Sequence, residues 1–208
     1  MAILSLPGTP RFQSASFQSR VNVRQFQSSE DGSVQTGQKP GSVWILEAAL
    51  PPMSRAVAQP WLAILMQLKG GAGRIYAGEP FMTAPLGSIP GTPLVKGASQ
   101  TGNSLITDGW TINQSDILLA GDMIAFELPS GGRQLTMITS DASSDGSGDS
   151  TLAIEPALRE SPADDQAIIT ASPTCVMRLM DVDGATWEPD TSGLYNIAFT
   201  LIESFNTG

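Results

Sequence analysis

The sequence contains no histidine and only one cysteine among its 208 residues. Histidine is the commonest general base and the commonest transition-metal ligand in proteins, so its absence excludes a Ser-His pair and removes the commonest ligand for a transition metal. The single cysteine, Cys175, cannot form a disulfide within the chain. Because it precedes the apolar pair Val176-Met177, we interpret it as a buried structural thiol.

Basic residues are also scarce, since 11 Lys and Arg stand against 20 Asp and Glu, which gives a formal net charge of −9. An acidic surface argues against wrapping nucleic acid or sitting on anionic lipid, but nucleic acid can slide past such a surface without adhering. No apolar run approaches the roughly 20 residues of a membrane span, so we expect no membrane insertion. The N-terminal stretch MAILSLPGTPRF has no cationic start and no apolar core, so we expect no secretory signal.

Glycine and proline are abundant, at 21 and 15 residues, and only one stretch has helical periodicity, which together predict a turn-rich, mainly β protein. The expected helix covers about residues 54–69, with Ser54 as a cap whose hydroxyl accepts a backbone N–H. Pro60 lies inside the pattern, so we expect a kink or a start nearer Gln59. Gly70-Gly71 can end the helix. The apolar residues expected on one face are Val57, Trp61, Ile64, Leu65 and Leu68.

A helix with one apolar face needs a sheet to cover, and the flanking sequence supplies strands. We predict strands at Val43–Leu50 and Arg74–Ala77, a half-buried strand at Ser16–Gln27, and a long loop at Ser28–Gly41 that is available for contact. Gly193–Phe205 has apolar residues at alternate positions, interrupted only by Glu203, which is typical of a long antiparallel strand. We expect this last strand to return to the first sheet. The buried side of the Ser16–Gln27 strand is expected to consist of Phe17, Val21 and Val23.

Residues 79–97 contain seven Pro and Gly, a density that no strand can continue through, so we place a domain boundary near Leu86. Short strands then recur about every ten residues, as in a small barrel. We therefore predict a β-sandwich with one packed helix, formed by residues 1–85 and 181–208, and an inserted barrel-like domain at 86–180. The strands expected beyond the boundary are Leu94–Ala98, Gly109–Ile112, Met123–Leu128, Gln134–Thr139, Thr151–Glu155, Ala167–Thr170 and Cys175–Met180.

The sharpest local motif is DASSDGSGD at Asp141–Asp149, where oxygen side chains alternate and glycine occupies the sixth position, as at the start of a calcium-binding loop. The twelfth position holds Leu152 instead of glutamate, and no helices are expected on either side. The alternative interpretation is a polar hairpin loop. Two other acidic pieces are interpreted as turns: Gly121-Asp122 before a strand, and Asp181–Gly184 as a hairpin turn.

The four tryptophans offer a further candidate site. Trp44 and Trp61 lie in apolar patterns and are assigned to the core. Trp110 and Trp187 lie next to turns, where they either cap the core or form an exposed platform for a sugar. There is no Ser-His pair, no Gly-x-Ser-x-Gly elbow and no phosphate-binding loop. We therefore predict no catalytic residue, no cofactor and no metal site, and we expect that the protein is not an enzyme.

Five segments together carry a likeness to a known group of proteins. They are LPPMSRAVAQPWLAILMQLKGGAGRIYAGEP, GTPLVKGASQTGNSLITDGW, LLAGDMIAF, RQLTMITSDASSDGSGDSTLAIEPALRES and GLYNIAFTLIESF. From about residue 12 onward, the chain resembles the distal tail proteins and related tail-tip, or baseplate, proteins of long-tailed bacteriophages. The likeness is to whole segments and not to a catalytic signature.

This resemblance implies a structural virion protein. The β-sandwich would assemble a ring, usually a hexamer, at the end of the tail tube, while the small β domain faces outward. The expected partners are further copies of the chain, the tail tube protein, and the tail hub or tape-measure protein; the expected location is the virion tail tip, after assembly in the host cytoplasm. From the net charge we expect an acidic lumen that DNA passes without specific binding. The alternative function is a module that binds carbohydrate or protein on the host surface through the inserted domain.

Overall fold

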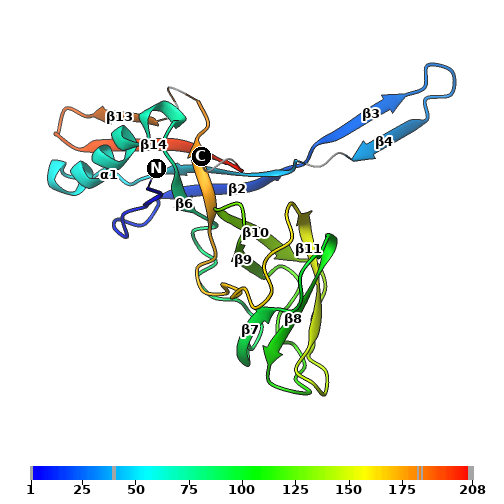
Figure 1. Cartoon of the computed structure of the whole chain (residues 1–208). Coiled ribbons are helices and arrows are strands. Elements are labelled where there is room, and N and C mark those ends of the chain that lie inside the picture. Colours follow the sequence, from blue (N-terminus) through cyan, green and yellow to red (C-terminus); the bar gives the residue numbers. More distant parts are fainter. Residues whose placement is uncertain (1, 39–40, 182, 184, 206–208) are drawn as a thin grey trace.

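The computed structural model describes residues 2–38, 41–181, 183 and 185–205. The strands form a seven-stranded sheet, a five-stranded sheet and a two-stranded sheet (Figure 1). The two-stranded sheet projects from the rest of the molecule, and we call it the arm. The expected fold class, mainly β with a sandwich, one packed helix and a small barrel-like part, is confirmed. Within the described residues, no helix is both long and apolar enough to cross a membrane.

The seven-stranded sheet is built around the last strand, β14, which pairs with β5 along one side and with β12 and β13 along the other. All pairings in this sheet are antiparallel except β1 with β6. The return of the final strand to the first sheet is therefore confirmed. The strands in spatial order are β1 (Leu4–Ser5), β6 (Ile75–Ala77), β12 (Cys175–Leu179), β14 (Tyr195–Glu203), β5 (Val43–Ala49) and β2 (Ser14–Arg20), and β13 (Ala185–Pro189) lies on β14.

Helix α1 (Arg55–Gln67) packs its buried residues Trp61 and Leu65 against one face of this sheet, with the Trp61 and Phe199 ring centroids 5.9 Å apart. Two expectations are wrong. Val57 is 42% exposed, and the Ser54 hydroxyl makes no cap hydrogen bond, so only the Ser54 carbonyl accepts helical N–H groups, from Val57 and Ala58.

The helix also begins at Arg55 and not near Gln59. Pro60 is tolerated because its missing N–H removes only one bond, to a carbonyl in the first turn. The helix is followed by η1 (Lys69–Gly71), where Gly70 at φ 60° and Gly71 at φ 95° supply the predicted left-handed residues.

The arm corrects the expectation of one strand at Ser16–Gln27 followed by a loop at Ser28–Gly41. β2 ends at Arg20, β3 covers Val23–Gln27, and β4 covers Val34–Gln38 within the expected loop. The break has a simple cause: Arg20 already pairs with the first residue of β5, so beyond it β2 has no neighbour. β3 therefore leaves the sheet and pairs with β4 alone. Val21 and Val23 are consequently 49% and 43% exposed instead of half-buried.

The five-stranded sheet curls into a barrel that the segment 165–169 closes. β-Bridges join Ala167 to Leu94 and Ile169 to Ala125, so this segment links the two edge strands of the sheet. The strand expected at Ala167–Thr170 is present only as these bridges. Of the strand expected at Gly109–Ile112, only Gly109 and Trp110 are in a strand, as the last residues of a nine-residue strand whose polar first half hides its periodicity. The strands in spatial order are β7 (Gly91–Val95), β8 (Gly102–Trp110), β11 (Ser150–Leu158), β10 (Arg133–Ile138) and β9 (Met123–Glu127).

The barrel and the seven-stranded sheet share a core through the β9–β10 hairpin, which forms as predicted. Met123, Ala125 and Leu135 belong to the core of the seven-stranded sheet, whereas Ile124 and Phe126 belong to the core of the barrel. The strand predicted at Cys175–Met180 was assigned to the inserted domain, and this assignment is wrong. It forms β12 and pairs with β6 and β14, so the chain re-enters the seven-stranded sheet before residue 181.

Candidate functional site

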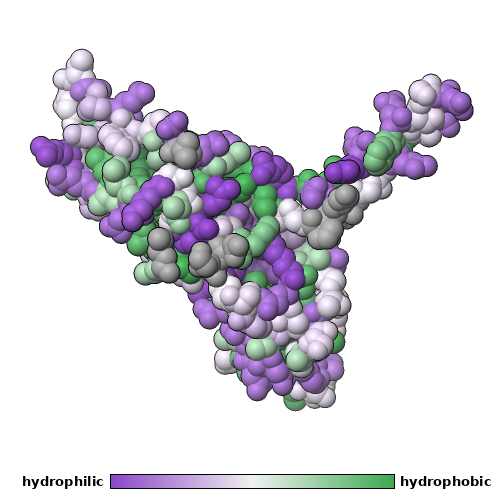
Figure 2. Space-filling model, turned by 45° about the horizontal axis from the view of Figure 1, so that its top comes forward, coloured by the Kyte–Doolittle hydropathy of each residue, from purple (hydrophilic) through white to green (hydrophobic). Residues whose placement is uncertain are grey.

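The arm exposes apolar side chains on both of its faces. Phe26 is 65% exposed, and Val23 and Val34 are 43% and 55% exposed. The strand register places the two valines on one face, and Phe26 with its cross-strand neighbour Gln35 on the other. A lone two-stranded hairpin is only marginally stable in water. The arm, which extends from the body in Figure 2, therefore has the composition of a segment that packs against a partner.

The turn of the arm is held by Asp31. Its carboxylate accepts hydrogen bonds from the Ser33 backbone N–H at 3.0 Å and from the Ser33 hydroxyl at 2.7 Å. The Ser33 backbone bond and the hydroxyls of Ser28 and Ser33 lower the pKa of Asp31 to about 2. The tip of the arm therefore carries a fixed negative charge at neutral pH.

In the described part of the chain, three strands of the seven-stranded sheet have one free edge each: β1, which has two residues and pairs only with β6, and the longer strands β2 and β13. Among the described residues, β2 pairs only with β5, and β13 pairs only with β14. Trp187 on β13 is 41% exposed, and Met66 at the end of α1 is 65% exposed. Both line a groove of about 430 Å³ beside the β13 edge, where the core is incompletely covered. Unpaired strand edges readily pair with strands of other chains.

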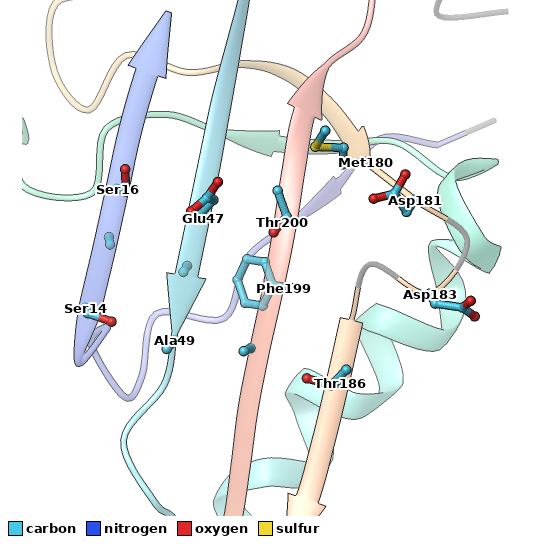
Figure 3. A pocket seen from close by; sticks show the side chains of 13 residues that line it. Ser14, Ser16, Glu47, Ala49, Met180, Asp181, Asp183, Thr186, Phe199 and Thr200 are labelled. Atoms are coloured by element: carbon cyan, nitrogen blue, oxygen red, sulfur yellow. The ribbon is translucent and has the colours of Figure 1, made fainter.

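The face of the sheet opposite α1 is open and polar around Glu47 and Thr200, whereas Ile45 and Ile202 on the same face are buried. A groove of about 630 Å³ runs over it, and Figure 3 shows Ser16 from β2, Glu47 from β5 and Thr200 from β14 on this face. The groove is also lined by Asp181 and Asp183. Among the described residues that line it, there are three acidic side chains and no lysine or arginine.

The Asp and Gly content of the segment that carries these two aspartates predicted a hairpin turn, and this prediction is wrong. β12 and β13 both pair antiparallel with the same side of β14, so they run in the same direction, one after the other. Asp181 and Asp183 therefore lie between two collinear strands; Val182 and Gly184 lie outside the described residues. Turn composition predicts that a strand is interrupted, but it does not determine the direction in which the chain continues.

The Asp141–Asp149 loop uses its carboxylates for hydrogen bonds and an ion pair. Asp141 accepts the Ala120 N–H at 2.9 Å, and Asp145 accepts the N–H groups of Ser147 and Asp149 at 2.7 and 3.0 Å. These backbone bonds lower the pKa of Asp145, and Asp149 pairs with Lys96. Across the described parts of the chain, no three His, Cys, Asp or Glu residues are grouped to hold a metal ion. The polar-loop interpretation accounts for this motif.

Asp122 lies just before strand β9, and its side chain also accepts hydrogen bonds from other segments. Its buried carboxylate accepts the backbone N–H groups of Leu86 at 2.7 Å, Gly87 at 3.0 Å and Leu119 at 2.8 Å. It thereby fixes the connection into the barrel, close to the predicted boundary. Gly121, at φ 99°, forms the expected turn. The sequence gives no signal for partners that lie about 35 positions away.

The tryptophans do not form a platform on the barrel. Trp110 is 4% exposed and its indole N–H donates to the Thr107 hydroxyl at 2.8 Å, so it belongs to the barrel core. Trp187 is exposed but lies on the seven-stranded sheet. Trp44 and Trp61 are buried, as predicted. Cys175 is also buried, and burial raises the pKa of its thiol well above the ordinary value.

A buried ion pair joins the barrel to the sheet, and the sequence analysis missed it. Glu203, which interrupts the apolar side of β14, is 4% exposed and accepts two hydrogen bonds from Arg159, at 2.5 and 2.7 Å. The Glu203 carboxylate also accepts a hydrogen bond from the backbone N–H of Trp44 at 3.1 Å, while the Arg159 guanidinium donates to the Ser42 carbonyl at 2.9 Å. Burial raises the pKa of Glu203, and the Arg159 guanidinium opposes that rise. An acidic residue in an apolar alternation was the only available signal.

The uncovered surfaces on or beside the seven-stranded sheet are therefore the arm, the free edges of β1, β2 and β13, and the polar groove on one sheet face. Exposed apolar side chains also lie elsewhere, among them Leu86 and the barrel residue Ile112. Comparison with known proteins adds no family, because no family model matches the chain and no curated protein matches its sequence.

Proposed function

We propose that this chain is a structural subunit that assembles into a closed ring at the distal end of a bacteriophage tail tube. In this role it connects the tube to the hub or receptor-binding apparatus and carries out no chemistry of its own. The observation that supports this proposal most strongly is the arm, whose apolar residues Val23, Phe26 and Val34 have no core to enter in a single chain. The resemblance of five segments to tail-tip proteins gives the proposal its biological setting.

The free edges of β2 and β13 support a head-to-tail association. They lie at different sides of the same sheet, so contact between them joins unlike surfaces of two copies. Such heterologous contacts close into a ring when the rotation between copies allows it, and closure leaves neither of these two edges exposed. The family resemblance favours six copies.

The open sheet face suits the lumen of such a ring. The other face is covered by α1 and by the β9–β10 hairpin of the barrel, so only the polar face is available to line a channel. Its groove carries Glu47, Asp181 and Asp183, whose carboxylates repel the phosphates of passing DNA. The barrel would then face outward.

Electron microscopy tests the proposal in two steps. Negative-stain images of the purified full chain are expected to show rings with a central opening, and an antibody against the chain is expected to label the tail tip of intact virions. Single particles the size of one 21.8 kDa chain at every concentration would count against ring assembly. Labelling of the capsid or of the whole tube would count against the tail-tip location.

A further inference from the structure

The two longer free strand edges, at β2 and β13, restrict how neighbouring copies would meet. In a ring whose axis runs along the strands, every copy keeps the same strand direction. Since β13 is antiparallel to β14, β14 to β5, and β5 to β2, the β2 strand of one copy would approach β13 of the next in antiparallel orientation. The pairing would continue the sheet from one copy into the next, as backbone hydrogen bonds at unpaired edges permit.

Side-chain parity restricts the register of this pairing. Trp187 pairs with Ile197, which faces the core, so Trp187 must meet a β2 residue on the core side of the sheet. On β2 the residues of that side are Ala15, Phe17 and Ser19, which alternate with the exposed Ser16 and Gln18.

Length restricts the register further. β13 has five residues with Trp187 at its centre, and β2 has seven residues. For all of β13 to lie opposite β2, Trp187 must face Ser16, Phe17 or Gln18, and only Phe17 is on the core side. Pro189, which has no N–H to donate, then lies at the end of the pairing, where its cost is smallest.

We propose that β2 of one copy pairs with β13 of the next so that Phe17 lies across from Trp187. This inference rests on the ring assembly proposed above and names the surfaces that form it. Phe17 already stacks on Trp44 with ring centroids 5.0 Å apart, and it is only partly buried. Contact with the exposed Trp187 would extend the aromatic core of one copy into its neighbour.

Charge complementarity supports the same register. Arg20 at the end of β2 would lie beside Asp183, just before β13, and near Asp181 in the same segment. All three side chains are exposed, and no ion pair joins any of them to another residue within the described part of one chain. The arm begins directly after Arg20, so this contact would also fix the root of the arm against the neighbouring copy.

Disulfide trapping tests the register in the full chain. The only native cysteine, Cys175, is buried, so introduced cysteines dominate the reaction. The register places Gln18 directly across from Thr186, and both are exposed. Mild oxidation of the double variant Gln18→Cys/Thr186→Cys is expected to give a reducible ladder of multimers on a denaturing gel, which ends at the ring size. Each single variant is expected to give no ladder.

The matched control is Ser16→Cys/Thr186→Cys, which is offset by two residues and places the two Cβ atoms about 7–8 Å apart, too far for a disulfide. A ladder in this control, or discrete rings that never crosslink in the matched variant, would overturn the register and leave the proposed function standing. A chain whose native mass is monomeric throughout would overturn the proposed function itself.

Charge reversal provides a second test. Arg20→Glu is expected to raise the dissociation constant of the ring about five-fold. The added change Asp183→Arg is expected to restore association, because it recreates the pair with opposite signs. Arg55→Glu alters the net charge equally at the start of α1 and is expected to have no effect. Equal weakening by Arg20→Glu and Arg55→Glu would contradict a specific pair.

Discussion

The barrel and the seven-stranded sheet differ in their outer strands, which are linked to each other in the barrel and have an unpaired edge in the sheet. In the barrel, bridges from Ala167 and Ile169 join the outer strands β7 and β9, and a separate core fills the interior. The seven-stranded sheet stays open at β1, β2 and β13, leaves a polar groove on one face, and extends an arm that has no core of its own.

This difference indicates which part of the chain can pair its outer strands within one copy. Closure removes the unpaired N–H and C=O groups that would attract other chains, so the barrel satisfies its own backbone. The sheet and the arm retain such groups together with exposed apolar side chains. We infer that the barrel is stable within one copy, whereas the sheet is completed by neighbouring copies.

The largest expected effect is on the barrel core. Trp110→Ala should lower the free energy of unfolding by about 4 kcal/mol, because a large buried side chain is replaced by a cavity. Trp187→Ala, at the open edge, should cost less than about 1 kcal/mol in the monomer. Urea denaturation of the two variants measures both values. Similar losses of unfolding free energy in the two variants would contradict the difference between a closed barrel and an open sheet.

The buried ion pair between the two regions should give the next largest effect. Arg159→Ala leaves the Glu203 carboxylate buried without its partner and should cost about 3 kcal/mol of unfolding free energy. The double variant Arg159→Met/Glu203→Leu removes both charges and should recover most of that loss. If the double variant were as unstable as the single one in the same denaturation experiment, lost packing and not an unpaired charge would be the cause.

A substitution in the arm should weaken assembly and leave the free energy of unfolding almost unchanged. Phe26→Asp should change the unfolding free energy by less than about 0.5 kcal/mol, because the side chain is exposed. It should raise the dissociation constant of the ring about 30-fold, as the loss of a buried aromatic anchor does. Ile112→Asp is the control on the barrel, where the residue is 54% exposed, and should alter neither quantity. Analytical ultracentrifugation measures the dissociation constant of the ring. A Phe26→Asp variant that assembles as the unmodified chain does would contradict a role of the arm in assembly.

The smallest expected effect concerns the turn of the arm. Asp31 should titrate with a pKa of about 2, below the ordinary 3.8. Because the folded pKa is depressed, its contribution to the turn is present above pH 3.8 and is lost as the pH falls toward 2. An NMR titration of the Asp31 carboxyl carbon measures this value, and Ser33→Ala should move it upward. A titration near 3.8 in the unmodified chain would show that the serine hydrogen bonds do not persist in solution.

Much of the fold could be predicted from the sequence because its signals are local. The period-two pattern of Gly193–Phe205, the apolar spacing that places Trp61 and Leu65 on one face, and the glycines after α1 each determine one element. The β9–β10 hairpin followed from its turn residues and alternation.

What the sequence did not predict depends on partners that are distant along the chain. β2 and β3 form one continuous pattern, and only the length of β5 shows why they separate at Arg20. Cys175–Leu179 has the same composition as the barrel strands, and its place beside β14 is set by tertiary pairing. Glu203 and Asp122 had no visible partners, because Arg159 and the Leu86–Gly87 backbone are remote in sequence. Exposure of Phe26 and Trp187 likewise could not be inferred from residue type.

The most direct test is the native mass of the full chain across a range of concentrations, alone and mixed with the tail tube protein that the proposal names as a partner. Ring assembly predicts one discrete closed oligomer, with six copies favoured, that forms without intermediates of unlimited length. A mass of 21.8 kDa under every condition would contradict it.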